Sequence, residues 1–125
     1  KDWNLDPEHI GVMGFSAGGH LASCLSTMHD GGAKSTKDPV EKWGCRPAFS
    51  ILVYPVISFR SKQGFSFSRG VLLGEFADPS LVDSLSTEMR VNSYTPPTFI
   101  VHTYDDNVRV ENSLLYFMAL REYNV

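Results

Sequence analysis

The sequence predicts an α/β fold in which helices flank a parallel β-sheet. Three short apolar runs, at residues 10–15, 49–54 and 98–102, are each bounded by turn residues, which is typical of strands buried on both faces. Segments with helical spacing of apolar residues follow the first and third runs. Strands that alternate with helices form a parallel sheet through right-handed crossovers. The chain of 125 residues has the length of one domain.

The first strand–helix unit spans residues 10–28. After the apolar run, residues 17–28 carry Leu21, Leu25 and Met28 at helical spacing, and glycines at positions 31 and 32 mark the end of the helix. The pattern predicts an amphipathic helix with these three residues in its apolar stripe. Residues 30–47 are polar and predict a loop before the second strand.

The second half of the chain predicts two further helices. Residues 56–79 lack a clear period and predict a surface excursion near the strand ends. A short helix at 79–86 would place Leu81, Val82 and Leu85 on its inner side. After a loop at 103–109, a helix from about residue 110 to residue 122 has an apolar stripe made of Val110, Leu114, Phe117 and Met118.

A nucleophile-elbow motif joins the first strand to the first helix. Gly14-Phe15-Ser16-Ala17-Gly18 matches Gly-x-Ser-x-Gly and lies between an apolar run and a helical pattern, which is the context that the motif requires. The chain must turn sharply with Ser16 at the tip, and side chains at positions 14 and 18 would collide across that turn. The hydroxyl then stands clear of the sheet, near the positive end of the helix. The motif predicts that Ser16 is a catalytic nucleophile.

The residue after the serine has a predicted role as well. The backbone N–H of Ala17 is placed to bind a developing oxyanion. The alternative interpretation is a glycine-rich strand–helix turn without a catalytic role. The bare motif arises by chance in about 4% of chains of this length, so its position between a strand and a helix carries the argument.

Four segments resemble the acetylxylan-esterase-like carbohydrate esterases of the α/β-hydrolase superfamily. They read GFSAGGHLA at 14–22, VYPVIS at 53–58, TPPTFIVH at 95–102 and VENS at 110–113. The segments occur in the same order in that family, so the resemblance covers essentially the whole chain. It implies an α/β-hydrolase fold, with a partial parallel sheet and flanking helices, and hydrolysis of small acyl esters, commonly acetyl groups on sugars or xylan.

The same resemblance identifies a candidate for the catalytic acid. In the superfamily the acid follows the serine, and relatives carry a loop that reads roughly His-x-x-Asp-Asp-x-x-Val-Pro, in which the second Asp orients the histidine. This chain has HTYDDNVRV at 102–110, one residue shorter and with Arg109 near the usual proline. The likeness favours Asp106 over Asp105; the acid's charge would fix the imidazole tautomer. Alternatively, the pair is a solvated loop end in which one Asp caps the next helix.

Two parts of the expected machinery are missing from the sequence. No histidine follows His102, and no oxyanion loop of the His-Gly-Gly-Gly type precedes Ile10. A whole domain of this kind usually needs about 200 residues or more. We therefore expect residues 1–125 to form a partial α/β-hydrolase domain without appreciable esterase activity of its own.

The four histidines are not expected to act as the base. His9 precedes the first strand, and His29 lies at a helix end, where a cation is favourable. The resemblance gives His20 a packing or hydrogen-bonding role on the elbow helix. His102 ends a strand directly before the acid loop and is disfavoured as the base.

Composition excludes several classes of partner. The net charge is −3, and the Lys and Arg residues are scattered, unlike those of a general nucleic-acid binder. No apolar run approaches the roughly 18 residues that span a bilayer, and residues 1–8 do not predict a signal peptide. The sequence does not begin with Met, so a leader on a longer precursor stays an open alternative. Serine-based acyl transfer implies no cofactor, and no residues have metal-ligand spacing. The expected partner is a small-molecule or carbohydrate ester, while Cys24 and Cys45 could be free or bridged.

Two other functions fit parts of the sequence. A peptidase of the prolyl-oligopeptidase type shares the fold and the triad, but such enzymes often have Tyr where this chain has Ala17. A degenerate, non-catalytic binding module would be expected to lose elbow residues, yet Gly14, Ser16 and Gly18 are all present. Both comparisons favour a serine esterase.

Overall fold

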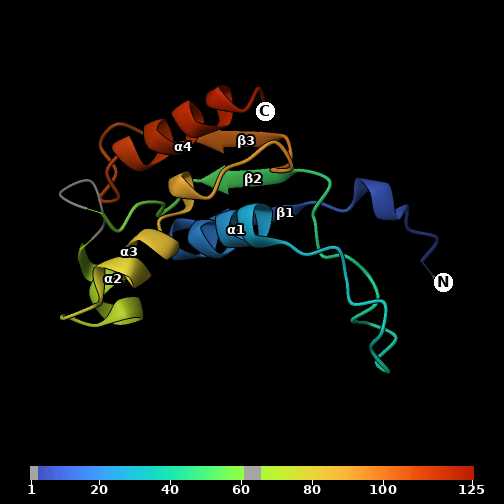
Figure 1. The fold of residues 1–125 in the computed structure, drawn as a ribbon. Helices are drawn as coiled ribbons and strands as arrows, with labels where there is room; N and C mark the ends of the chain where they lie inside the picture. Colours follow the sequence, from blue (N-terminus) through green and yellow to red (C-terminus); the bar gives the residue numbers. More distant parts are fainter. Residues whose placement is uncertain (1–2, 61–65) are drawn as a thin grey trace.

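Strands and helices alternate along the chain, as the apolar pattern predicts (Figure 1). The computed structural model describes residues 3–60 and 66–125. Its elements are, in chain order, η1 Pro7–His9, β1 Val12–Phe15, α1 Ser16–Met28, β2 Ser50–Val53, α2 Ser66–Leu73, α3 Pro79–Ser84, η2 Thr87–Met89, β3 Thr98–Val101 and α4 Glu111–Glu122. Each predicted strand is present and is shorter than its apolar run.

The three strands form a parallel sheet in the order β1-β2-β3. In register, Phe15 of β1 lies beside Val53 of β2, which lies beside Val101 of β3. The strands run in the same direction and end in the same row, so the segments after them emerge at one edge of the sheet. The elbow follows β1. The acid loop, residues 102–110 with the two candidate acids, follows β3, so both motifs lie at the carboxyl edge of the sheet.

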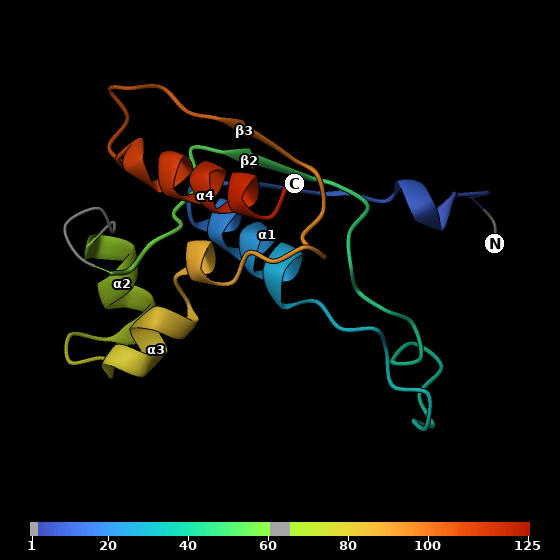
Figure 2. The ribbon, with the colours of Figure 1, turned by 45° about the horizontal axis from the view of Figure 1, so that its top comes forward.

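Helices α1 and α4 pack on the same face of the sheet (Figure 2). The core of this layer joins Leu52 of β2 to Ala22 of α1 and to Tyr116 and Leu120 of α4, and all four side chains are buried. Burial of such apolar side chains is the main favourable contribution to folding. The sheet and the two helices therefore form one packed unit.

The opposite face of the sheet is apolar and is covered by no helix within the described residues. Phe99 is 62% exposed and Met13 is 55% exposed in one cross-strand row, and Phe15 and Val101 are exposed in the next. The prediction of strands buried on both faces is therefore wrong for the described structure, because no element lies over these side chains. Parallel sheets normally have both faces covered, so this surface has the character of an interior layer.

Helix α1 approaches the sheet through small residues, which differs from the predicted stripe. Leu21 is 72% exposed, Met28 is also exposed and Leu25 is half-buried. The buried positions are Gly19, His20, Ala22, Ser23, Ser26 and Thr27. A Cβ at Gly19 would lie 2.7 Å from Cβ of Pro55, so only a small residue permits this approach. The buried Ser26 and Thr27 hydroxyls donate to carbonyls one turn earlier, which satisfies them.

Helix α4 is also rotated away from its predicted stripe. Leu114, Phe117 and Met118 are exposed, whereas the buried residues are Asn112, Ser113, Tyr116 and Leu120. Hydrogen bonds of Asn112 and Ser113, described below, hold this polar start of the helix against the sheet. Apolar spacing alone carries no information about these bonds.

The segment after β2 is more ordered than the predicted surface excursion. Val56, Ile57, Ser58 and Phe59 are all buried, and helix α2 follows them. In the short helix α3, Val82 is buried and Leu85 half-buried, as predicted, but Leu81 is exposed. Part of the predicted excursion, at 61–65, lies outside the described residues.

Candidate functional site

Ser16 lies at the junction of β1 and α1 in a strained backbone conformation. Its φ is +51°, in the left-handed region that residues with a Cβ rarely occupy. Such a conformation costs on the order of 1–3 kcal/mol and persists where the surrounding structure enforces it. The strand leads directly into the helix at this residue, so the predicted sharp turn is confirmed.

The turn needs a glycine before the serine, but not at both predicted positions. A Cβ at Gly14 would lie 2.1 Å from the carbonyl oxygen of Gly18, which no side chain could tolerate. A Cβ at Gly18 would meet nothing within 4 Å of the described structure, so the predicted collision there is wrong. The steric constraint after the serine falls on Gly19, which contacts Pro55.

The groups around the elbow leave Ser16 and Ala17 available for chemistry. The backbone N–H of Val56 donates to the carbonyl of Ser16 at 3.0 Å and ties the elbow to the segment after β2. Within the described residues, neither the Ser16 hydroxyl nor the Ala17 N–H has a hydrogen-bond partner. The first N–H groups of a helix have no intrahelical acceptor and carry the positive end of its dipole. An oxyanion beside Ser16 would meet that positive end.

A second strained residue stands beside the elbow and was not anticipated from the sequence. Tyr54, at the end of β2, has a φ of +34°, although it precedes a proline. Its ring packs edge-on against Phe15 with 6.1 Å between ring centroids. Strained, non-glycine residues at the ends of adjacent strands are a feature of functional sites. No sequence pattern indicated this one.

The two candidate acids differ in their surroundings. Asp106 is half-buried, and its Oδ1 accepts a hydrogen bond from the Val108 N–H at 2.8 Å. Asp105 is exposed and makes no hydrogen bond among the described residues. Neither carboxylate caps α4, whose N-cap residue is Val110 without a side-chain bond, so the capping alternative is wrong. Asp106 is therefore the carboxylate that the loop holds in place.

His102 connects the acid loop to the start of α4 through hydrogen bonds at both ring nitrogens. Its Nε2 lies 2.7 Å from the carbonyl oxygen of Val108 and must donate to it, because a carbonyl only accepts. Its Nδ1, at 2.7 Å, then accepts from the Ser113 hydroxyl. Both ring nitrogens are thus engaged, which leaves none to accept a proton from Ser16. This geometry agrees with the expectation that His102 is not the base.

Asn112 links the elbow side of the site to the acid loop. The side chain is fully buried; its Oδ1 accepts from the N–H groups of Ile57 and Ser58, both at 3.0 Å. Its Nδ2 donates to the carbonyl of Arg109 at 3.0 Å. The neighbouring residue Val56 holds Ser16, so one amide connects the two motifs. In the sequence, the only indication of this connecting role is an Asn at the start of a helix that otherwise looks apolar.

A cavity of about 570 Å³ runs along α1 beside the elbow. Its lining includes Ala17, His20 and Cys24 of α1 and apolar residues of α2. His20 is buried against the Phe59 ring at 4.7 Å, and its Nδ1 has no partner among the described residues, so the predicted packing role is present. Burial lowers the pKa of His20 and raises that of the Cys24 thiol to about 11. A neutral thiol and imidazole therefore face this space at neutral pH.

The remaining candidate groups take simple roles. Cys24 and Cys45 are both free thiols, which decides the alternative left open above. His29 ends α1, and its Nδ1 lies 3.1 Å from the carbonyl oxygen of Ser26. Among the described residues, no three His, Cys, Asp or Glu side chains come together as metal ligands would. The described helices include none with the length and apolar character to cross a bilayer.

Comparison with known proteins places this site in a family. Residues 1–120 match the BD-FAE family profile. The acetylxylan esterase of Xylanibacter ruminicola is 41% identical over 126 residues, covering 97% of this chain and 24% of that protein. The endo-1,4-beta-xylanase B of Butyrivibrio fibrisolvens is 36% identical over 124 residues, covering 98% of this chain and 19% of that protein.

A solved structure is similar across the whole chain. It is the acetyl ester-xyloside bifunctional hydrolase from Caldicellulosiruptor lactoaceticus, with a TM-score of 0.96 and 53% sequence identity. The superposition covers 99% of this chain and 46% of that one, so the chain spans less than half the length of these relatives. The architecture is that of α/β-hydrolase esterases. The profile match and the identities together show that the chain belongs to the BD-FAE family.

Proposed function

We propose that this chain carries the nucleophile and the acid of a serine esterase that removes acetyl or other small acyl groups from carbohydrate esters. One observation carries the proposal: Ser16 is held at a φ of +51° on the turn between β1 and α1, with a hydroxyl that no described residue engages. The names of the relatives, acetylxylan esterase and acetyl ester-xyloside hydrolase, support the substrate class.

In the proposed reaction, the Ser16 oxygen attacks the acyl carbonyl while a histidine outside these 125 residues accepts the hydroxyl proton. The Ala17 N–H stabilises the negative charge that develops on the carbonyl oxygen. The histidine gives that proton to the departing sugar oxygen, which leaves as the free alcohol. The histidine then takes a proton from water, which attacks the acyl-serine, and returns it to the Ser16 oxygen as the acid is released. Asp106 orients the histidine with its Oδ2, since its Oδ1 is held by Val108.

A hybrid enzyme tests this proposal in a complete domain. Residues 1–125 replace the matching 46% of the Caldicellulosiruptor lactoaceticus hydrolase, and hydrolysis of p-nitrophenyl acetate is measured. The substitution Ser16→Ala is expected to lower kcat by at least about 10³-fold, because the covalent step is lost. The exposed Ser35→Ala is the matched control and should leave kcat unchanged.

Three results would contradict the proposal. They are a Ser16→Ala hybrid that retains its activity, a hybrid that unfolds cooperatively but never hydrolyses the ester, and a hybrid that prefers proline-containing peptides to acetyl esters. The 125-residue chain alone should show no appreciable turnover, since it supplies no histidine to accept the Ser16 proton.

A further inference from the structure

A groove lined by charged and aromatic residues lies at the other end of the sheet from the elbow. Its volume is about 720 Å³, within the range of about 300–1,000 Å³ typical of small-molecule sites. The lining residues that matter here are Glu8, His29, Asp30, Trp43, Arg46 and Tyr94. His29 follows the last residue of α1, whose first residue is Ser16, so the 13-residue helix separates the groove from the elbow by about 20 Å.

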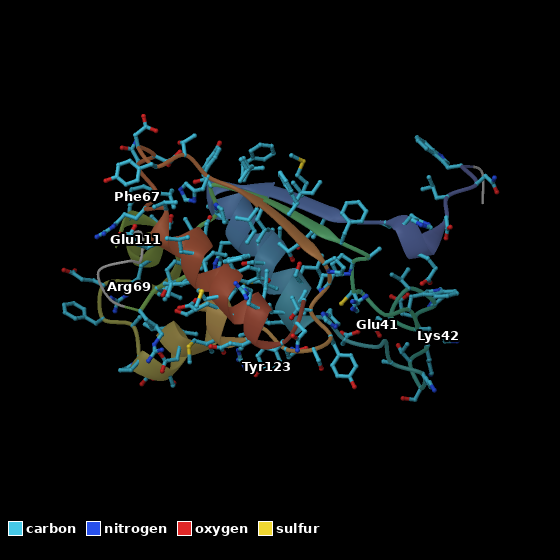
Figure 3. All side chains as sticks on the ribbon, turned by 90° about the horizontal axis from the view of Figure 1, so that it is seen from above. Glu41, Lys42, Phe67, Arg69, Glu111 and Tyr123 are labelled. Carbon is cyan, nitrogen blue, oxygen red and sulfur yellow. The ribbon has the colours of Figure 1, made fainter. Side chains whose placement is uncertain are left out.

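Two large aromatic side chains flank this groove and are open to solvent. Trp43 is 79% exposed and Tyr94 is 73% exposed. Trp43 lies on the loop at 30–45, which projects away from α2 and α3 (Figure 1). In Figure 3, Glu41 and Lys42 of this loop lie at the far end of the molecule from Phe67 and Glu111. Exposed aromatic rings beside a groove are typical of surfaces that bind a ligand with an apolar face.

The backbone under both rings is held firmly. The 30–45 loop closes on itself through the Cys45 N–H, which donates to the Asp30 carbonyl at 3.1 Å, and the Ala33 N–H, which donates to that of Glu41 at 2.7 Å. Tyr94 donates its N–H to Asn92 Oδ1 at 2.8 Å within a braced turn.

Arg46 Nε joins the two loops by donating to the Tyr94 carbonyl at 2.7 Å. The rings are therefore presented on fixed backbone, and little ordering is needed when a ligand binds.

Hydrogen-bonding groups line the same groove as the two rings. The carboxylates of Glu8 and Asp30 supply acceptors, and the terminal nitrogens of Arg46 supply donors with no described partner. The Nδ1 of His29 bonds to the end of α1, which leaves Nε2 for a ligand. Two carboxylates against one guanidinium give a slightly negative lining, which disfavours polyanions such as nucleic acids. A neutral ligand rich in hydroxyl groups suits this set.

We propose that the groove binds a neutral oligosaccharide, with sugar rings packed on Trp43 and Tyr94. The apolar C–H face of a pyranose covers an aromatic ring, while its hydroxyls exchange hydrogen bonds with Asp30, Glu8 and Arg46. Xylan is the polymer named for two relatives, so xylo-oligosaccharides are the class we assign. The site lies apart from Ser16 and does not depend on the proposed reaction. It would hold the polysaccharide while acyl groups on other parts of the same polysaccharide are hydrolysed.

Binding is measured by isothermal titration calorimetry, with unsubstituted xylohexaose titrated into wild type and each variant. The 125-residue chain is used once its cooperative urea unfolding has been recorded, and the hybrid enzyme is used if the isolated chain does not unfold cooperatively. Trp43 fluorescence in the Trp3→Phe background is a second readout for the variants that keep Trp43. We expect a saturable change, and we expect Trp43→Ala and Tyr94→Ala each to weaken binding about three- to tenfold.

Matched controls distinguish binding at this groove from nonspecific binding to exposed aromatic side chains. Trp3→Ala and Phe76→Ala remove rings outside the groove that are even more exposed, and they should leave the affinity unchanged. Tyr94 lies on a different loop from Trp43, so Tyr94→Ala tests the site independently if Trp43→Ala unfolds. Circular dichroism shows whether each variant is folded.

Two outcomes would overturn the proposal. One is the absence of a saturable change with xylohexaose, and the other is equal binding by wild type and both groove variants. Because xylohexaose has no ester, and because Ser16→Ala should bind it normally, this result is independent of whether Ser16 is a nucleophile.

Discussion

At the scale of single residues, the elbow depends on one glycine more than on the other. Gly14→Ala would place a Cβ 2.1 Å from the Gly18 carbonyl oxygen, and we expect a loss of about 3 kcal/mol or more in the free energy of unfolding. Gly18→Ala meets open space and replaces a helix-interior glycine, so we expect no loss and a gain of up to about 1 kcal/mol. Urea denaturation followed by far-UV circular dichroism compares them. Equal midpoints for the two variants would refute this steric interpretation.

The buried imidazole of His20 makes a separate residue-scale prediction about pH. Burial lowers its pKa below 6.5, so near pH 6 the unfolded chain binds more protons than the folded chain does. The free energy of unfolding should therefore fall as pH drops through 6.5 towards the folded pKa. Carboxyl groups whose pKa is lowered in the folded chain, such as Glu111, change the free energy of unfolding only at lower pH, below about 4.5.

The His20→Gln variant supplies the control for that measurement. Its urea midpoint should change less than the wild-type midpoint between pH 7.5 and pH 5, since Gln does not titrate in that range. Parallel pH profiles for the two proteins would show that His20 is not the group responsible.

At the scale of elements, Asn112 connects three segments that the reaction would need in fixed positions. In the hybrid enzyme, Asn112→Asp keeps an acceptor for the Ile57 and Ser58 N–H groups but loses the donor to the Arg109 carbonyl. We expect kcat for p-nitrophenyl acetate to fall about tenfold, because the acid loop is released, while KM stays nearly constant. The exposed Asn124→Asp is the matched control. Unchanged kcat in Asn112→Asp would rule out a positioning role.

The sequence predicted the order of elements well and their orientation less well. Short apolar runs and the elbow motif identified all three strands, α1 and α4, because these patterns reflect local spacing. The rotation of α1 and α4 could not be read from apolar residues, since α1 packs through Gly19 and its small neighbours and α4 through Asn112. Helix α2 was missed although Phe67, Val71 and Leu72 have helical spacing, because the pattern covers only eight residues within a segment that is otherwise irregular in sequence.

The candidate site was predictable only where a motif names its residues. Ser16 and Asp106 were predicted from the elbow and from a family-like loop. Tyr54 was missed, because its strain arises from tertiary packing against Phe15 and not from a local preference. The bonds that fix His102 between Val108 and Ser113 likewise join residues that only the fold brings together.

At the scale of the whole molecule, one face of the sheet is covered by helices and the other is exposed within the described residues. Helices α1 and α4 cover one side of the sheet, while Met13, Phe15, Phe99 and Val101 remain exposed on the other. The chain matches 46% of a solved hydrolase at a TM-score of 0.96. Tests of catalysis therefore belong in the hybrid enzyme, which supplies the remaining part of a solved hydrolase.

The most direct test of the central claim is covalent labelling of the hybrid enzyme with a fluorophosphonate, followed by peptide mass spectrometry. We predict one phosphonylated residue within residues 1–125, the strained serine after β1, with labelling abolished in the Ser16→Ala variant. An active hybrid labelled on a different serine, or not labelled within these residues, would contradict it.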